Sequence, residues 1–175
     1  MNRIKGFGPP AWIESVAAVH PEHRFDQAQA LGIVEEWLGG GGGLPLRSAR
    51  KVFSHAGVGV RHSASPSTEF LNVTDFGRKT ELYLTAARRE GKAVVEKLLQ
   101  QSGVTPDAID LFISVSCTGF VIPSIDAYLA NEFAFRSDLK RLPITELGCA
   151  AGASALARAR EYLMAFPDAK ALVLS

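Results

Sequence analysis

The sequence predicts an α/β fold in which a mainly parallel sheet is flanked by helices. Short apolar runs rich in β-branched residues alternate with longer segments whose apolar residues recur at helical spacing. The composition is that of a globular protein, because 47% of the 175 residues are hydrophobic and 21% are charged, which excludes a disordered chain. This length suits one domain with its own core.

The elements expected before residue 75 are short. We interpret residues 12–20, which carry several apolar side chains, as a strand. A helix is expected from about 26 to 38, where the five glycines 39–43 would stop it and form a linker. A short basic helix over 46–53 and an extended piece over 58–61 should follow.

The second part of the sequence has stronger patterns. A long helix is expected over 75–101, because its apolar residues fall on one face and its charges mostly on the other. Residues 109–116 form a continuous apolar run, which is typical of a strand buried on both faces. Four further elements complete the alternation: a helix from Pro123 to about Phe133, a strand over 142–147, a helix over 150–166 and a strand over 169–174.

Two segments follow strands at the edge of the sheet where ligands of parallel α/β folds bind. They are residues 116–120 and 146–153. In the second segment Cys149 lies between a strand and a helix, Gly148 permits a sharp turn and Gly152 permits close packing. A helix amino terminus favours a thiolate, and its backbone N–H groups can receive an oxyanion. Cys149 is therefore a candidate nucleophile, with a buried structural cysteine as the other interpretation.

Charge and cysteine content limit the partners. The net charge of +1 gives no reason to expect a nucleic acid, and no apolar stretch is long enough for a membrane span. Two cysteines cannot form a disulfide framework, and no apolar signal segment follows the first ten residues. We expect a cytoplasmic protein with reduced thiols and no cofactor. The pair His20 and His23 lacks clustered cysteine or carboxylate ligands, so we interpret it as a surface turn rather than a metal site.

The two segments also carry a family resemblance. Residues 144–157, around Cys149, resemble the active-site cysteine segment of type III polyketide synthases, the chalcone and stilbene synthase family. Residues 116–126 resemble the strand, loop and helix that precede this cysteine in the family, at a matching interval. Residues 52–62 resemble an earlier family segment more loosely, and the similarity runs from about Trp12 to Ser175.

The resemblance implies a thiolase fold, which is built from two similar halves. Residues 1–175 would form a single amino-terminal thiolase-like domain, and the carboxyl-terminal half would be absent. Synthases of this family act as homodimers on coenzyme A (CoA) thioesters. They load an acyl group onto the cysteine, extend it by decarboxylative condensation with malonyl-CoA and usually cyclise the product.

The resemblance also assigns roles near the nucleophile. Cys149 would carry the acyl group. Cys117 and Thr118 match positions that line the cavity beside that cysteine. Ile122, directly before Pro123, matches a position that reaches across the dimer into the partner's cavity.

A second group of residues would bind CoA. Lys51 matches a basic residue that contacts the CoA phosphates, and Arg47 and Arg50 are close enough in sequence to share this role. These three cations on one short helix also fit a diphosphate independently of the resemblance. The alternative interpretation is a solvated helix face. His55 departs from the family pattern, since many relatives carry a lysine there.

The family's catalytic His and Asn belong to the second half of the fold. None of the four histidines here matches the catalytic one; they are His20, His23, His55 and His62. A thiolate alone does not decarboxylate and condense, because the developing charges need stabilising groups. We therefore expect the isolated chain to be inactive. Half of a two-half fold would expose apolar surface, so we also expect it to aggregate or to associate with a partner.

Three alternatives remain open from the sequence. The first is a chain-initiating ketoacyl-acyl-carrier-protein synthase, which would take its substrate from a carrier protein. The second is a non-catalytic half-domain that only binds a partner chain. The third is a cysteine hydrolase built on the same strand–turn–helix segment, which would need one of the distant histidines near Cys149.

Overall fold

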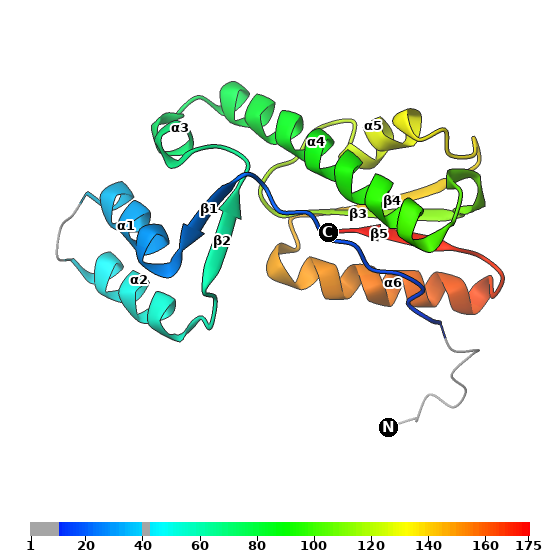
Figure 1. The fold of residues 1–175 in the computed structure, drawn as a ribbon, viewed down its shortest axis with the longest axis horizontal. Helices are drawn as coiled ribbons and strands as arrows, with labels where there is room; N and C mark the ends of the chain where they lie inside the picture. Colours follow the sequence, from blue (N-terminus) through cyan, green and yellow to red (C-terminus); the bar gives the residue numbers. More distant parts are fainter. Residues whose placement is uncertain (1–10, 40–42) are drawn as a thin grey trace. The chain divides into compact units, whose positions relative to one another are not determined.

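The computed structural model describes residues 11–39 and 43–175, and their contacts divide the chain into two compact units (Figure 1). The sheet unit comprises the residues up to Val19 and those from Tyr83 to Ser175. The ribbon unit comprises His20–Leu82. The long helix α4 (Phe76–Ser102) begins in the ribbon unit and continues into the sheet unit. No helix of the described residues is long and apolar enough to cross a membrane.

The sheet unit is built on three parallel strands. β3 (Leu111–Ser116) is central, with β4 (Lys140–Thr145) on one side and β5 (Ala171–Leu174) on the other. Helices α4 and α5 (Ile125–Glu132) cover one face, and α6 (Ala151–Ala165) covers the other (Figure 1). The predicted α/β fold with a mainly parallel sheet is therefore confirmed.

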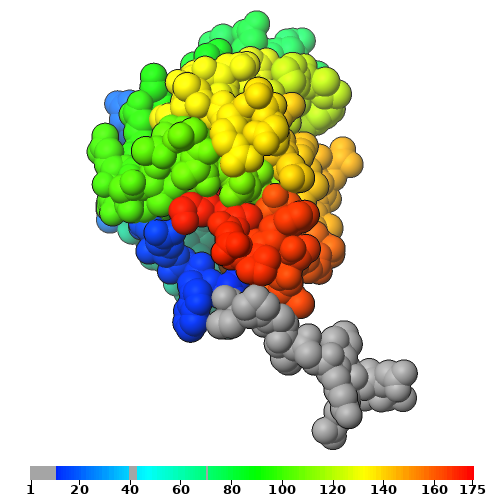
Figure 2. All heavy atoms as spheres, turned by 90° about the vertical axis from the view of Figure 1, so that its right-hand side faces the viewer, coloured from blue at the N-terminus to red at the C-terminus, as the bar shows by residue number. Residues whose placement is uncertain are grey.

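Alternate residues of β3 fill the two sides of the core. Phe112 has no exposed surface and packs with Val95 of α4 and Leu129 of α5. Leu111 and Ile113 point to the opposite face and pack against the alanines of α6. Figure 2 shows the result from one side, with the red carboxyl-terminal residues between the green residues of α4 and the orange residues of α6. Burial on both faces explains why the strand reads as one continuous apolar run.

A polar contact joins α5 to the sheet within this core. Asp126, in the first turn of α5, has no exposed surface. Its carboxylate accepts a hydrogen bond from the hydroxyl of Ser114 at 2.8 Å and pairs with the guanidinium of Arg141 at 3.2 Å. Because both oxygens have partners, the buried charge is compensated, and α5 is held against β3 and β4.

The ribbon unit contains a two-stranded antiparallel ribbon and short helices. β1 (His23–Asp26) pairs with β2 (Val60–Ser63), with His23 opposite Ser63. Asp26 caps α1 through a reciprocal pair of hydrogen bonds with Gln29, which explains where this helix begins. The helices of this unit are α1 (Gln27–Trp37), α2 (Leu44–His55), α3 (Ser67–Asn72) and the first turns of α4.

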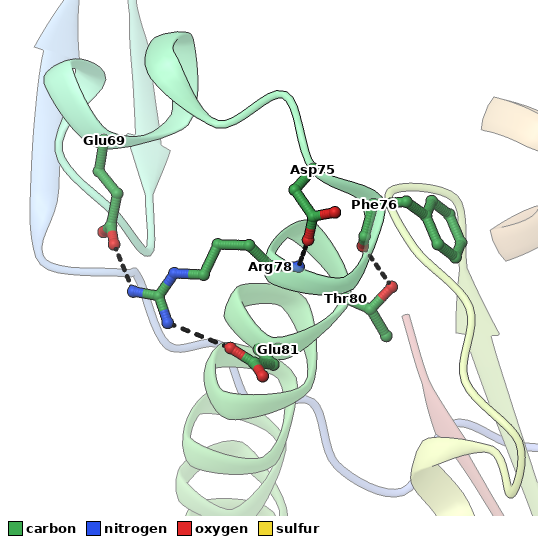
Figure 3. A network of polar contacts seen from close by, with 6 residues as sticks. All are labelled: Glu69, Asp75, Phe76, Arg78, Thr80 and Glu81. Carbon is green, nitrogen blue, oxygen red and sulfur yellow. Dashed lines mark hydrogen bonds and ion pairs between the residues drawn. The ribbon is translucent and has the colours of Figure 1, made fainter.

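An ion-pair network links α3 to the start of α4 (Figure 3). The guanidinium of Arg78 bonds to Glu81 at 3.3 Å and to Glu69 of α3 at 3.1 Å. Asp75 accepts a hydrogen bond from the backbone N–H of Arg78 and so caps α4. Hydrogen bonds to Glu81 and Glu69 raise the pKa of Arg78.

The expectations for the longer elements are confirmed to within a few residues. The helices expected over 26–38, 46–53, 75–101, 123–133 and 150–166 correspond to α1, α2, α4, α5 and α6, and the strands over 109–116, 142–147 and 169–174 to β3, β4 and β5. The extended piece over 58–61 overlaps β2. Of the predicted glycine linker, residues 40–42 lie outside the described part of the chain.

The strand expected over 12–20 is wrong. These residues are not part of either sheet, and Trp12, Ile13 and Val16 are largely exposed. A strand requires a neighbour that pairs with its backbone, and no described strand does so here. The segment is instead fastened to α4, since the ammonium of Lys97 donates a hydrogen bond to the carbonyl of Ala18 at 2.9 Å.

Candidate active site

The carboxyl ends of β3 and β4 lie side by side, with Ser116 opposite Thr145. The two segments that follow these strands are in direct contact. The thiol of Cys117 donates a hydrogen bond to the carbonyl of Gly148 at 2.9 Å, one residue before Cys149. The structure thus brings together two cysteine segments that are about 30 residues apart in the sequence, as expected for adjacent parallel strands.

The segment that carries Cys149 is a sharp turn from strand to helix. Two of its residues have a left-handed backbone, Glu146 with a φ of 65° and Gly148 with a φ of 61°. Cys149 then lies in a single 3-10 turn, Gly148–Ala150, immediately before α6, and its side chain is exposed. Glycine adopts a positive φ freely, whereas glutamate does so at a cost, so the turn stores strain beside the cysteine.

This geometry places Cys149 at the amino-terminal end of α6. The backbone N–H groups of the first turn of a helix have no partner within the helix and point along its axis. One of these N–H groups, that of Ala151, donates a hydrogen bond to the carbonyl of Gly148. The same carbonyl also accepts the hydrogen bond from the Cys117 thiol. The partial positive charge at the amino terminus of a helix favours a developing oxyanion.

Gly152 allows α6 to start close to the neighbouring strand. A Cβ added at Gly152 would lie 3.3 Å from the hydroxyl oxygen of Ser175. This separation is shorter than an ordinary van der Waals contact, so a larger residue would require the Ser175 side chain to shift by a few tenths of an ångström. The close packing predicted from the sequence is present at Gly152.

The other predicted cavity residues are on the surface of the loop between β3 and α5. Cys117 and Thr118 are exposed, and the side chain of Ile122 is 89% exposed. A small pocket opens nearby at the ends of the two strands. Hydroxyl groups line part of it, namely those of Tyr83, Ser114, Ser116, Ser124 and Thr145, with apolar side chains of the loop around them.

The predicted CoA-binding residues lie on α2 in the ribbon unit. Arg47, Arg50 and Lys51 are exposed, and their spacing of three and four residues puts them on one face of the helix. The guanidinium of Arg50 pairs with Glu35 of α1 at 2.7 Å. In the described part of the chain no acidic side chain pairs with Arg47 or Lys51. This face has the charge that a phosphate ligand requires.

The four histidines also lie in the ribbon unit. The rings of His20 and His62 stack with their centroids 4.8 Å apart, and Nδ1 of His62 is 2.9 Å from the carbonyl oxygen of Pro21. Among the described residues there is no group of three or more side chains that could hold a metal ion.

Sequence reasoning missed Tyr83, which projects from α4 towards the loop of Cys117. Its hydroxyl donates a hydrogen bond to Ser116 at 2.7 Å, and its ring covers Gly119. Sequence reasoning also missed the positive φ of Glu146. Only the position of Tyr83, near the start of the apolar face of a long helix, offers a signal, and it does not indicate which loop the ring meets.

The chain is similar to several known synthases. The chain is 35% identical to a 1,3,6,8-tetrahydroxynaphthalene synthase of Streptomyces griseus over 156 residues, which cover 89% of this chain and 41% of that protein. It is 31% identical to a phloroglucinol synthase of Pseudomonas fluorescens, over 81% of this chain and 40% of that protein. The chain therefore spans less than half the length of these relatives.

Solved structures agree with the sequence matches. The crystal structure of the 1,3,6,8-tetrahydroxynaphthalene synthase of Streptomyces coelicolor, a bacterial type III polyketide synthase, superposes with a TM-score of 0.78 and 31% identity. The superposition covers 91% of this chain and 46% of that one. The resemblance and the thiolase-like fold inferred from the sequence are thereby confirmed. A family model described as FAE1/type III polyketide synthase-like protein matches residues 44–175, and the chain belongs to that family.

Proposed function

We propose that this chain supplies the amino-terminal, acyl-carrying half of a type III polyketide synthase, with Cys149 as the nucleophile. The observation that carries the proposal is the strand–turn–helix geometry at Cys149, an exposed thiol directly before α6. The membership of the family supports the same reaction class. In this proposal residues 1–175 act as one amino-terminal thiolase-like domain.

The proposed reaction begins with acyl transfer. The thiolate of Cys149 attacks the carbonyl carbon of an acyl-CoA, the bond between that carbon and the CoA sulfur breaks, and CoA leaves with the proton that the cysteine gave up. The acyl group is then held as a thioester at the start of α6. In this proposal backbone N–H groups of the turn stabilise the oxyanion that forms during the attack.

Extension would use malonyl-CoA. Loss of carbon dioxide leaves the electron pair of the broken C–C bond on an enolate, which attacks the Cys149 thioester and releases the cysteine as a thiolate. The enolate and the oxyanion both need stabilising groups besides the thiol. The family resemblance assigns these to a His and an Asn in a carboxyl-terminal half. We therefore propose that this chain condenses substrates only in association with such a half.

The surface of the sheet unit supports association. β4 lies at one side of the sheet and five of its six residues are exposed, and Ile122 and Leu147 near the candidate active site are exposed as well. Apolar side chains in such positions are typical of surfaces that meet another chain or domain. We further propose that the assembled synthase forms a homodimer and is located in the cytoplasm. Lys51, Arg47 and Arg50 bind the CoA phosphates in this proposal.

Acyl loading tests the nucleophile directly. The chain, assembled with a carboxyl-terminal half of a type III synthase, is incubated with isotopically labelled acetyl-CoA and digested, and the labelled peptide is identified by mass spectrometry. We expect the label on the peptide that carries Cys149 and none in the Cys149→Ala variant. Label on the peptide that carries Cys117 would overturn the assignment.

Two further arms separate the alternatives. The isolated chain should form no pyrone or resorcinol product from malonyl-CoA and an acyl-CoA, and appreciable product would refute the need for a second half. Transfer from malonyl-acyl-carrier protein but not from malonyl-CoA would indicate a chain-initiating ketoacyl synthase. Stable binding of the second half without any acyl loading would indicate a non-catalytic interaction domain.

A further inference from the structure

The loop that carries Cys117 is covered from one side by a single aromatic ring. A Cβ added at Gly119 would lie 2.5 Å from Cγ of Tyr83 and within 3 Å of two further ring atoms. Contacts this short do not occur between real side chains, so only glycine fits beneath this ring. Tyr83 is half-buried and comes from α4, whose rigid helix fixes where the ring lies.

The hydroxyl of the same tyrosine holds the start of the loop. It donates to Oγ of Ser116 at 2.7 Å, and the Ser116 hydroxyl in turn donates to the carbonyl of Gly119. Tyr83 therefore contacts both ends of the four-residue segment Ser116–Gly119, Ser116 through a hydrogen bond and Gly119 through its ring. Chains of hydroxyl hydrogen bonds of this kind strengthen one another when they are shielded from water.

Cys117 is the first residue inside this held segment. Its thiol donates to the carbonyl of Gly148, the residue before Cys149. A thiol is a weak donor, so this contact alone cannot fix the loop. The side-chain position of Cys117 beside the Cys149 turn therefore depends on the contacts of Tyr83 with Ser116 and Gly119.

We propose that Tyr83 is a positioning residue that sets the location of Cys117 against the Cys149 turn, and so sets the wall of the cavity in which the growing chain is held. The consequence for the cavity rests on the proposed function, whereas the positioning of Cys117 does not. Tyr83 acts through the loop and touches neither cysteine in the contacts described above. Its loss should change how Cys117 reacts and leave the Cys149 turn in place, because that turn is fixed by Gly148 and α6.

The test compares the alkylation rates of the two cysteines within one molecule. The full 175-residue chain is treated with limiting iodoacetamide, and each site is quantified by mass spectrometry. Tyr83→Phe keeps the ring and removes the hydroxyl, and we expect the ratio of the Cys117 rate to the Cys149 rate to change about fivefold, the factor that one lost hydrogen bond corresponds to. Tyr162→Phe is the matched control and should leave the ratio unchanged, because Tyr162 lies in α6 with its ring tilted against that of Phe166.

A double-mutant cycle separates positioning from general loosening. Gly119→Ala forces the ring of Tyr83 away and should shift the ratio in the same direction as Tyr83→Ala. In the variant that carries both substitutions the added methyl group has space, so the effect should equal that of Tyr83→Ala alone. Additive effects in the cycle, a ratio within about twofold of the parent in Tyr83→Phe, or an equal rise at both cysteines would each overturn the proposal.

The same samples show which proposal fails. After assembly with a carboxyl-terminal half, Tyr83→Phe should change the distribution of extension products formed from acetyl-CoA and malonyl-CoA. Loss of loading in the parent protein would refute the proposed function and leave the alkylation ratio interpretable. If the ratio of the alkylation rates changes and the product distribution does not, only the proposed effect of Tyr83 on the cavity wall would be refuted.

Discussion

The hydroxyl of Ser114 donates a hydrogen bond at 2.8 Å to the carboxylate of Asp126, which has no exposed surface. Ser114 belongs to the central strand and Asp126 to the first turn of α5, so this contact orients the helix that follows the Cys117 loop. The partly exposed guanidinium of Arg141 neutralises the buried charge from the neighbouring strand.

Removal of this carboxylate should destabilise the protein. We expect Asp126→Ala to lower the free energy of unfolding by about 2 kcal/mol, because the Ser114 hydroxyl loses its acceptor in the core while Arg141 remains accessible to water. Urea unfolding followed by circular dichroism measures the change. The control Glu161→Gln removes an exposed pair with Arg158 and should cost less than about 0.5 kcal/mol. Equal losses in the two variants would contradict this account.

A second prediction concerns the approach of α4 to its neighbours. A Cβ at Gly91 would lie 3.1 Å from a methyl group of Leu129 in α5 and 3.6 Å from one of Leu174 in β5. Gly91→Val should therefore lower the free energy of unfolding by about 1–3 kcal/mol through overpacking. Gly32→Val is the matched control, because Gly32 lies in α1 with no atom within 4 Å of the added Cβ. If Gly32→Val is as destabilising, the loss is not due to packing.

The left-handed backbone of Glu146 leads to a third prediction. Asparagine tolerates this conformation and β-branched residues do not, so Glu146→Val should be less stable than Glu146→Asn by about 1 kcal/mol or more. Chemical unfolding of the two variants measures the difference. Glu146→Val should also load acyl groups onto Cys149 more slowly, because the turn must distort. Indistinguishable stabilities would show that the conformation is not constrained in solution.

A fourth prediction concerns pH. A hydrogen bond from Arg136 lowers the pKa of Asp138, and the charge of the same guanidinium adds to the effect. Since the folded pKa is depressed, the stabilisation by this pair is present above the ordinary aspartate pKa of about 3.9 and is lost as the pH falls through the folded value. The contribution is small, because the pair is exposed to water.

A carboxyl carbon titration by nuclear magnetic resonance tests this fourth prediction. The pKa of Asp138 should rise towards its usual value in Arg136→Gln. Arg158→Gln, which removes a guanidinium paired elsewhere with Glu161, should leave the titration of Asp138 as it is in the parent protein. A titration curve that is the same with and without Arg136 would disprove the assigned cause.

The elements whose sequence pattern is local were predictable. The apolar stripe of α4 and the continuous apolar run of β3 specify their own conformation and burial, because helical periodicity and two-sided burial leave a mark in each segment. β1 was not predicted as a strand, since it reads His-Arg-Phe-Asp and depends on a partner that lies more than 30 residues later. The strand prediction for residues 12–20 was wrong for the converse reason. These residues have the composition of a strand, but no described strand pairs with them.

The candidate site was predictable in part for the same physical reason. Parallel topology places the ends of neighbouring strands together, so the proximity of the two cysteine segments followed from their positions after β3 and β4. The sharp turn at Gly148 was also expected from its residue type. The role of Tyr83 could not be predicted, because it depends on the depth at which a helix packs and on the absence of a Cβ at Gly119. Neither quantity leaves a sequence pattern.

The small residues of α6 set how closely this helix packs on the sheet. Ala151, Ala155 and Ala159 are buried and allow α6 to lie directly on Leu111 and Ile113 of β3. Cys149 precedes the amino-terminal end of this helix, so a bulky substitution at Ala155, about one turn inside it, should shift the helix and displace the Cys149 sulfur. Substitutions of the buried alanines in α6 should therefore disturb the position of Cys149, although these alanines do not line the pocket at the ends of β3 and β4.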